Sequence, residues 1–191
     1  MLTHKGTQTI ETARLILRQA QMADAQPMFQ NWASDPEVTK FLTWTTYESV
    51  DAAYPILDMW INGYKNPAFY QWMIVLKDIG EPVGSISVVE QNDNVGKAEI
   101  GYCIGRAWWH QGIVSEALTA VIDYLFSQVG MNRIEAKHDT NNPHSGGVMK
   151  KCGMKCEGMA RQAFRSNHGI GDMEQYAILR EDWGNNGKMP K

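Results

Sequence analysis

A strand that runs through a short loop directly into an amphipathic helix is the feature that most constrains the fold of this chain. The run AEIGYCI at 98–104 favours a strand. After the loop, apolar residues recur at helical spacing, at Val114, Ala117, Leu118, Val121, Ile122 and Leu125. The helix is expected to stop at Gly130, and the strand-like run RIEAKH at 133–138 follows it. The order strand, helix, strand predicts a right-handed parallel crossover.

Shorter periodic runs on both sides of this unit predict the rest of the fold. Further strands are predicted at 13–20, 71–76, 82–89, 156–164 and 172–179. Further helices are predicted at 24–32, at about 46–61 and at 144–151. The sequence therefore predicts an α+β fold, in which helices flank a mixed, mostly antiparallel sheet with one parallel pair near its centre.

Length, charge and cysteine content limit the class of protein. A chain of 191 residues without an internal linker or repeat is predicted to form one domain over 11–184, with polar, poorly ordered tails at 1–10 and 185–191. The formal charge of -3 disfavours binding to nucleic acid. No apolar run approaches the ~18 residues that span a bilayer, so no membrane partner is expected. An odd count of three cysteines and the absence of a leader favour the cytoplasm.

The loop before the central helix has the features of an anion site. The first turn of a helix leaves backbone N–H groups without partners and carries a partial positive charge. Gly112 lies in that loop and permits a close approach to the backbone. The alternative interpretation is an ordinary helix start with a glycine in its turn.

Two segments together resemble the GNAT superfamily of acetyl-CoA-dependent N-acetyltransferases. They are 99–117 (EIGYCIGRAWWHQGIVSEA) and 141–154 (NNPHSGGVMKKCGM). With the opening TARLILRQA and the later run EGMAR, they most resemble the RimJ/RimL-like branch, the relatives of ribosomal-protein N-acetyltransferases. The resemblance implies a GNAT-like single domain whose central parallel strand pair splays apart, and acetyl-CoA as co-substrate with no metal.

The resemblance also implies which residues hold acetyl-CoA. The family's pyrophosphate loop falls on the segment Trp109, His110, Gln111, Gly112, Ile113, Val114 and Ser115, and binds mainly through main-chain N–H groups. The strand residues Tyr102, Cys103 and Ile104 would offer backbone groups to the pantetheine arm and the acetyl carbonyl. Candidates for the outlying phosphates are Arg106, Lys150, Lys151 and Lys155.

The start of the next helix is expected to carry the proton donor to the departing thiolate. Asn142 and Ser145 match the family's Asn-x-x-Ser position, where Asn142 would bond the pantetheine amides and Ser145 would lie near the sulfur. The alternative for both residues is helix capping. Many relatives place a tyrosine acid four residues further on, where this chain has Met149, which has no proton to donate. We therefore predict Ser145 as the donor, with a bound water or direct release of the thiolate as alternatives.

The reaction also needs a neutral amine. A lysine amine costs roughly 4 to 5 kcal/mol to deprotonate at pH 7, whereas an N-terminal amine costs only about 1. We predict Glu99 as the catalytic base, because some members carry a glutamate on the corresponding strand. Three later carboxylates stay open as bases, at Glu135, Glu157 and Glu174. Glu116, in the first turn of the central helix, is interpreted as structural.

The predicted function is acetyl transfer from acetyl-CoA to a primary amine, most plausibly a protein N-terminal α-amine. Two alternatives stay open. The acceptor could be a polyamine, aminoglycoside or amino acid, captured by the aromatic residues Trp44, Tyr47, Trp60 and Tyr64, or the chain could be a non-catalytic CoA-binding or interaction module. A zinc site among the later histidines and cysteines and an acylated Cys103 are both disfavoured by spacing. A monomer and a homodimer are both compatible with the sequence.

Overall fold

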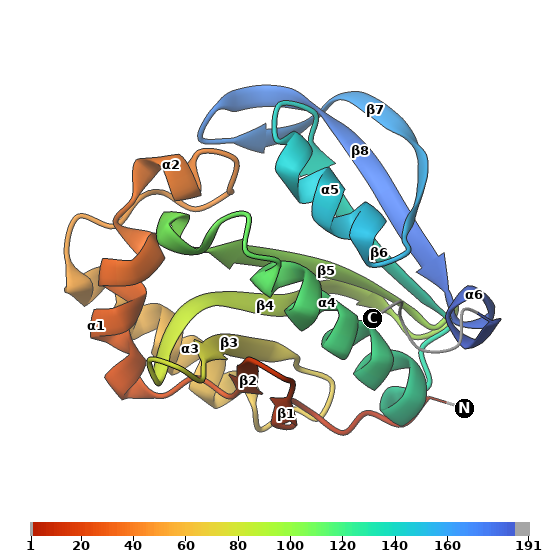
Figure 1. Cartoon of the computed structure of the whole chain (residues 1–191), viewed down its shortest axis with the longest axis horizontal. Helices are drawn as coiled ribbons and strands as arrows, with labels where there is room; N and C mark the ends of the chain where they lie inside the picture. Colours follow the sequence, from red (N-terminus) through yellow and green to blue (C-terminus); the bar gives the residue numbers. More distant parts are fainter. Residues whose placement is uncertain (1, 186–191) are drawn as a thin grey trace.

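The computed structural model describes residues 2–185 and contains an eight-stranded sheet in the order β1-β2-β3-β4-β5-β6-β8-β7 (Figure 1). Its strands are β1 (Ile10–Glu11), β2 (Leu15–Arg18), β3 (Gln71–Leu76), β4 (Glu81–Asn92), β5 (Lys97–Ile104), β6 (Arg133–Asp139), β7 (Lys155–Ser166) and β8 (Gly169–Leu179). Its α-helices are α1 (Ala25–Met28), α2 (Pro36–Thr39), α3 (Ala53–Gly63), α4 (Ile113–Tyr124), α5 (Pro143–Lys151) and α6 (Arg180–Asn185). The predicted mixed, mostly antiparallel sheet is confirmed.

The sheet is split between β5 and β6. These two strands are the parallel pair that the crossover predicts, and they pair only at Lys97 with Arg133, Ala98 with Ile134 and Glu99 with Glu135. Beyond these pairs β5 continues beside β4 as far as Ile104, and β6 continues beside β8 as far as Asp139. The facing edges of β5 and β6 therefore diverge toward their carboxyl ends.

Helices cover both faces of the sheet. Buried side chains of α4 and α5 form the main core with strand residues such as Ile134 and Ala136. On the other face, α1 and α3 form a second core with Met73 and Val75 of β3. Leu15 and Leu17, which alternate in the sequence, are both fully buried in the main core, as amphipathic β2 requires.

Two glycines define the ends of the central helical segment. Gly112 precedes α4 in the left-handed region, with φ +72°. A π-helical turn (Leu125–Val129) extends α4, and Gly130 ends it with φ +86°. Both positions favour a residue without Cβ, so the predicted helix stop at Gly130 is confirmed.

The short helix α2 does not appear among the sequence predictions, although its start has a clear signal. The side chain of Asp35 accepts a hydrogen bond from the backbone N–H of Glu37 at 3.0 Å, and Pro36 occupies the first helical position. Asp followed by Pro is a favoured N-terminus, because Pro needs no N–H partner there. Residues of α2 and of the segment after it line a cavity.

The N-terminal segment is a correction to the sequence analysis. We predicted a poorly ordered tail at 1–10, but residues 2–10 lie against the domain. The Thr7 hydroxyl donates to the Phe69 carbonyl at 3.0 Å and accepts from the Gln71 N–H at 3.0 Å, and the Tyr124 hydroxyl donates to the Gly6 carbonyl at 2.7 Å. The sequence shows no apolar periodicity here, because these contacts are hydrogen bonds of the Thr7 hydroxyl and of a backbone carbonyl. Residues 186–191, most of the other predicted tail, lie outside the described part of the chain.

Within residues 2–185, none of the helices combines the length and the apolarity needed to cross a bilayer.

Candidate active site

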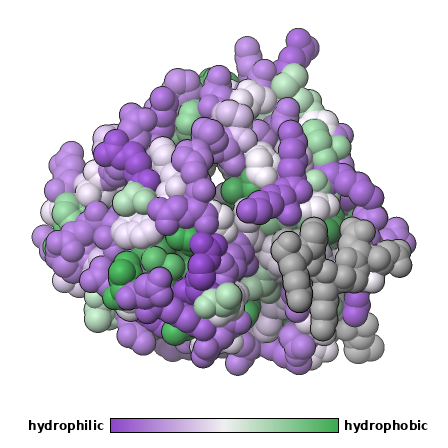
Figure 2. Space-filling model, in the orientation of Figure 1, coloured by the Kyte–Doolittle hydropathy of each residue, from purple (hydrophilic) through white to green (hydrophobic). Residues whose placement is uncertain are grey.

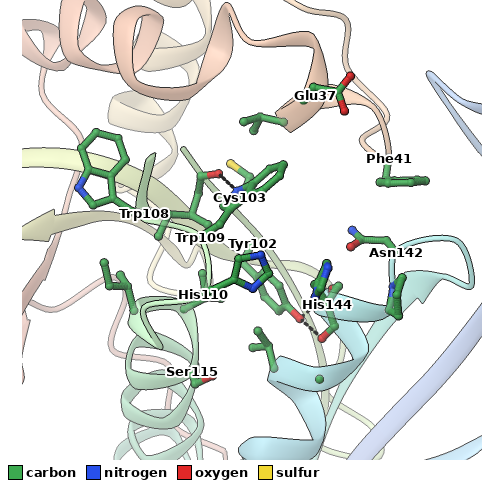
Figure 3. A pocket seen from close by; sticks show the side chains of 18 of the residues that line it. Glu37, Phe41, Tyr102, Cys103, Trp108, Trp109, His110, Ser115, Asn142 and His144 are labelled. Carbon is green, nitrogen blue, oxygen red and sulfur yellow. Dashed lines mark hydrogen bonds between the residues drawn. The ribbon is translucent and has the colours of Figure 1, made fainter. Parts of the chain in front are cut away.

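A cavity of about 460 Å³ lies at the carboxyl end of β5, between the loop before α4 and the start of α5 (Figure 3). The predicted cofactor residues that line it are Tyr102, Cys103, Ile104, Trp109, His110, Gly112, Ile113, Val114, Ser115, Asn142, Ser145 and Lys151. We call this wall, over 102–115 and 141–151, the cofactor side. The opposite wall is formed by residues around α2, at 37–42, and we call it the acceptor side.

Gly112 lies at the centre of the predicted anion site. A Cβ built at Gly112 would lie 3.4 Å from Lys151 Nζ and 3.8 Å from the terminal guanidinium nitrogen Nη2 of Arg14. Two cations therefore face the backbone amides that begin α4, whose helix dipole also favours an anion. This arrangement fits a diphosphate group. Gly112 has no side chain to cover the backbone amides, and the two cations nearby would balance the negative charge.

Arg14 is a functional candidate that the sequence analysis missed. Its Nε donates to Glu116 at 2.7 Å and its Nη1 donates to the Gln111 carbonyl at 2.9 Å. Glu116 also accepts from the Thr12 hydroxyl at 2.6 Å and from the Arg14 backbone N–H at 2.9 Å. Although burial alone would raise it, these donors hold the pKa of Glu116 below its usual value. No local sequence pattern indicates a role for Arg14, since its partners Gln111 and Glu116 lie about a hundred residues further along the chain.

Two hydroxyl groups meet on the cofactor side (Figure 3). The phenol of Tyr102 donates to the Ser145 carbonyl at 3.0 Å, and its oxygen lies 2.9 Å from Ser145 Oγ. Burial raises the pKa of Tyr102, so the phenol stays protonated. Met149, at the position where relatives often carry a tyrosine, is buried in the main core. Strand β5 thus brings a phenol next to Ser145, whereas α5 carries none at position 149.

Asn142 occupies the N-cap position of α5, but its side chain makes no capping hydrogen bond. Figure 3 shows this side chain among those that line the cavity. The capping interpretation therefore holds for the position of Asn142 and not for its amide group, which is free to bind a ligand. Cys103 lies nearby on β5, and burial raises the pKa of its thiol. A protonated thiol is a poor nucleophile, which disfavours an acylated Cys103.

Two histidines approach each other from opposite elements of the cofactor side. His110 precedes α4 with φ +61°, and His144 lies in the first turn of α5. Their ring centroids are 4.5 Å apart with the planes at 78° (Figure 3). Trp109 faces away from this pair, since its indole N–H donates to the Ile104 carbonyl and its ring packs on the second core. The loop is thus held in shape by its own side chains.

Glu99, the predicted base, does not line the cavity. Its carboxylate accepts a hydrogen bond from Lys137 Nζ at 2.6 Å across the start of the split between β5 and β6. It also lies four residues before Cys103, about 13 Å along the strand. Glu99 can therefore exchange a proton with a ligand in the cavity only through intervening water.

The three other carboxylates are engaged elsewhere. Glu135 pairs with Arg133 at 2.6 Å and with Lys97 at 3.1 Å. Glu157 pairs with the same Arg133, and Glu174 pairs with His138 at 3.2 Å. None of the three carboxylates is among the residues that line the cavity.

Several predicted phosphate contacts also lie outside the cavity lining. The exposed Gln111 bonds the Ala107 carbonyl through its side chain. Arg106 pairs with Asp35 at 2.9 Å, and Lys155 pairs with Asp182 at 2.8 Å. The exposed Lys150 lies over the ring of Tyr176. Of the four predicted phosphate cations, Lys151 lines the cavity.

The acceptor side brings in residues that the sequence analysis did not select. Glu37, Val38, Lys40, Phe41 and Leu42 line the cavity from α2 and the loop after it (Figure 3). The Asp35–Pro36 helix start could have located this segment. The predicted aromatic residues Trp44, Tyr47, Trp60 and Tyr64 instead pack against the second core.

In the described part of the chain, 2–185, no group of three or more histidine, cysteine or acidic side chains is placed to hold a metal ion.

Comparison with known proteins agrees with this geometry. A family model described as "Acetyltransferase (GNAT) domain" matches residues 14–155, which is more than two thirds of the chain. The chain belongs to the GNAT family of acetyltransferases and is an N-acetyltransferase; this family uses acetyl-CoA as acetyl donor.

Particular relatives place the chain within the family. It is 32% identical over 180 residues to the "Uncharacterized N-acetyltransferase p20" of Bacillus licheniformis, covering 92% of this chain and 98% of that protein. It is 32% identical over 84 residues to the "[Ribosomal protein uS5]-alanine N-acetyltransferase" of Escherichia coli, covering 44% of this chain and 43% of that protein. A crystal structure of a GNAT acetyltransferase from Bacillus anthracis superposes with a TM-score of 0.79 at 25% identity, covering 91% and 99% of the two chains. The homologues of this chain thus include a ribosomal-protein N-acetyltransferase, in agreement with the predicted RimJ/RimL-like branch.

Proposed function

We propose that this protein transfers the acetyl group of acetyl-CoA directly to the α-amine at the N-terminus of a protein. The observation that carries the proposal is the cofactor side, where Gly112 and the first turn of α4 present backbone amides between Arg14 and Lys151. This site fits the diphosphate of acetyl-CoA, and the diverging edges of β5 and β6 supply unpaired backbone groups for the arm that carries the thioester.

The placement of the carboxylates supports an α-amine as acceptor. Glu99 is bonded to Lys137 and lies outside the cavity lining, and Glu37 lines the cavity from the acceptor side but is exposed to solvent. Neither carboxylate lies on the cofactor side, where the acetyl group would be held. An N-terminal amine with a pKa near ~7.8 needs only about 1 kcal/mol to become neutral at pH 7, against roughly 4 to 5 kcal/mol for a lysine amine. The printed name of the Escherichia coli relative, a uS5-alanine N-acetyltransferase, points to the same acceptor class and to a cytoplasmic reaction.

The residues of this chain divide the chemistry between them. Acetyl-CoA supplies the activated acetyl group when bound. Asn142 offers its free amide group to the cofactor arm, and the Ser145 hydroxyl donates a hydrogen bond to the sulfur as the thiolate departs, which then takes its proton from water. Tyr102 holds the Ser145 hydroxyl in place. Glu99 receives the proton of the attacking amine through water.

Thiol release from acetyl-CoA tests the proposal. Purified protein is assayed with a hexapeptide that begins with alanine, with the same peptide blocked at its N-terminus but carrying a lysine, and with spermidine. We expect turnover with the free N-terminus to exceed that with the other two amines. Turnover with spermidine alone would favour the small-amine alternative, and turnover with no amine would remove the proposal.

The role of Glu99 has a separate test. We expect Glu99→Gln to lower kcat at least threefold, because the amide cannot accept the proton. A loss of less than about threefold, which is under 1 kcal/mol, would reject Glu99 as the base.

A further inference from the structure

The loop after α2 is tied to a turn more than a hundred residues away. Asn167, in the turn between β7 and β8, donates through its backbone N–H to the Leu42 carbonyl at 3.1 Å. Its side-chain amide Nδ2 donates to the Thr39 carbonyl at 2.9 Å and to the Trp44 carbonyl at 2.7 Å. One asparagine thus satisfies three backbone carbonyls of a loop that has no regular structure of its own.

Neighbouring side chains reinforce this tie. The ring of His168 contacts the ring of Phe41 edge-on, with centroids 5.5 Å apart. Within the turn, the His168 N–H donates to the Ser166 hydroxyl at 3.2 Å. Within the loop, the Thr39 and Thr46 hydroxyls lie 2.5 Å apart. The turn and the loop are therefore each stabilised by a hydrogen bond of their own, in addition to those that join them.

We call the tied segments, 39–44 and 166–168, the bridge. The helix α2, which leads into the bridge, is fixed at its start to the segment after β5 by the ion pair between Asp35 and Arg106 at 2.9 Å. The far end of the bridge is the turn between β7 and β8, which extends past the end of β6. Figure 1 shows α2 and this turn approaching each other at one end of the molecule, and Figure 2 shows the surface hollowed near the middle of the face drawn. The bridge therefore crosses the space into which β5 and β6 diverge.

The underside of the bridge is also the acceptor side of the cavity. Lys40, Phe41 and Leu42 line the cavity opposite Tyr102 and Asn142. We expect an amine that attacks an acetyl group on the cofactor side to contact these residues on its way. Because the loop is bonded to Asn167 at Thr39, Leu42 and Trp44, moving this wall away from the cavity would break these hydrogen bonds.

We propose that Asn167 determines acceptor specificity by closing the bridge, so that the cavity admits a primary amine at the end of a slim, extended chain and excludes amines carried on rigid rings. This inference rests on the proposed function, since it narrows the acceptor class of the same site. It also separates two acceptors that the sequence leaves open, because an extended polypeptide end passes beneath the bridge and an aminoglycoside does not.

The test compares Asn167→Ala with the wild type on three probes: the alanine hexapeptide, spermidine as a second slim amine, and kanamycin, whose amines are carried on rings. Asn167→Ala removes both side-chain hydrogen bonds and keeps the backbone bond to Leu42. We expect the kcat/KM ratio of kanamycin to the better slim amine to rise about tenfold, equivalent to about 1.4 kcal/mol, with KM for acetyl-CoA unchanged. Asn62→Ala is the matched control, because its amide bonds the Asp58 carbonyl at 3.0 Å on the exposed face of α3, away from the cavity.

A second variant guards against a folding defect. His168→Ala removes the ring contact with Phe41 but leaves all three Asn167 hydrogen bonds, and we expect the same change of preference at a smaller size, about threefold, or about 0.6 kcal/mol. An unchanged preference in both variants overturns the inference, as does a wild-type enzyme that acetylates kanamycin as fast as the slim amines. Failure of the proposed function looks different, since the wild type would then prefer spermidine to the hexapeptide or release no thiol at all. A wild type that releases no thiol also overturns the inference, which rests on that function.

Discussion

The cofactor side and the acceptor side of the cavity differ in how their residues are distributed along the chain. The cofactor side consists of two continuous segments, 102–115, which passes from β5 into α4, and 141–151, which follows β6 and contains α5. The acceptor side consists of an irregular loop whose carbonyl at Trp44 is held by Asn167, 123 residues away. The cofactor side is therefore formed locally at two strand-to-helix junctions, whereas the acceptor side depends on tertiary contacts.

The largest expected effect tests whether the cofactor side carries the chemistry. Ser145→Ala should lower kcat about 10²-fold with little change in KM for acetyl-CoA, because it removes the donor to the departing thiolate. Steady-state kinetics measures both parameters. Ser145→Thr, which keeps a hydroxyl, should recover part of the loss, and the exposed Ser127→Ala is a control away from the cavity. Similar kcat values for Ser145→Ala and wild type would leave the thiolate to depart without help from Ser145.

The next effect tests whether the anion site depends on local backbone geometry. Gly112→Ala should raise KM for acetyl-CoA about tenfold, because alanine at φ +72° costs about 1 to 2 kcal/mol and its Cβ would face Lys151. Gly80→Ala is the matched control, since Gly80 has φ +69° and nothing within 4 Å of the added Cβ. An equal rise of KM in both variants would show that a strained backbone anywhere in the fold raises KM. An unchanged KM in Gly112→Ala would contradict the anion site.

A third prediction concerns the hydrogen bonds that join Thr12 and Arg14 to Glu116 in the first turn of α4. Donors from Thr12 and Arg14 keep the pKa of Glu116 below its usual value. The carboxylate therefore stabilises the fold at neutral pH, and this contribution is lost as the pH falls through the lowered folded-state pKa. Glu116→Gln should lower the free energy of unfolding by about 1 to 2 kcal/mol at pH 7.

Denaturant unfolding at several pH values measures this difference. It should shrink as the pH is lowered through the folded-state pKa of Glu116. Glu11→Gln is the control, because its ion pair with Lys77 is exposed and should contribute little. A difference between wild type and Glu116→Gln that stays constant at every acidic pH would contradict the assignment of the effect to ionisation.

The smallest expected effect tests whether a residue distant in the sequence contributes to the cofactor side, since Arg14 lies beside Gly112 without lining the cavity. Arg14→Gln should raise KM for acetyl-CoA about threefold and leave KM for S-acetylpantetheine unchanged, because the latter lacks the diphosphate; the size is that of a partly exposed ion pair. Arg18→Gln, which loses the ion pair with Asp24, controls for stability. Equal increases with both donors would assign Arg14 to loop structure alone.

The same contrast explains what the sequence could predict. The succession of strands along the chain and the crossover through α4 follow from periodicity, which is a local signal. The anion site at Gly112 stays a prediction from one glycine at a helix start. Ser145 and Asn142 follow from resemblance, and the structure brings both to the cavity. Arg14 and Asn167 could not be predicted, because their roles depend on partners that only the folded chain brings near.

Glu99 illustrates a limit within a correctly predicted strand. Alternation correctly places it on one face of β5 with Gly101 and Cys103. Its ion pair with Lys137 depends on the point where β5 and β6 separate, and no pattern in either strand marks that point. The order of residues 2–10 could not be predicted for a related reason. Hydrogen bonds hold this segment, and they produce no apolar periodicity in the sequence.

The three paired residues of β5 and β6 have a consequence for how the sheet meets its ligand. Past Glu99 and Glu135, each strand keeps one edge whose amides and carbonyls lack a neighbour, enclosed within the fold. An edge of this kind on the outside of a protein invites aggregation, but here it is sheltered between α4 and α5. A linear arm that carries amide groups, laid into this seam, would complete the ladder as an inserted strand, and amide hydrogen exchange along 101–104 and 136–139 would slow as it enters.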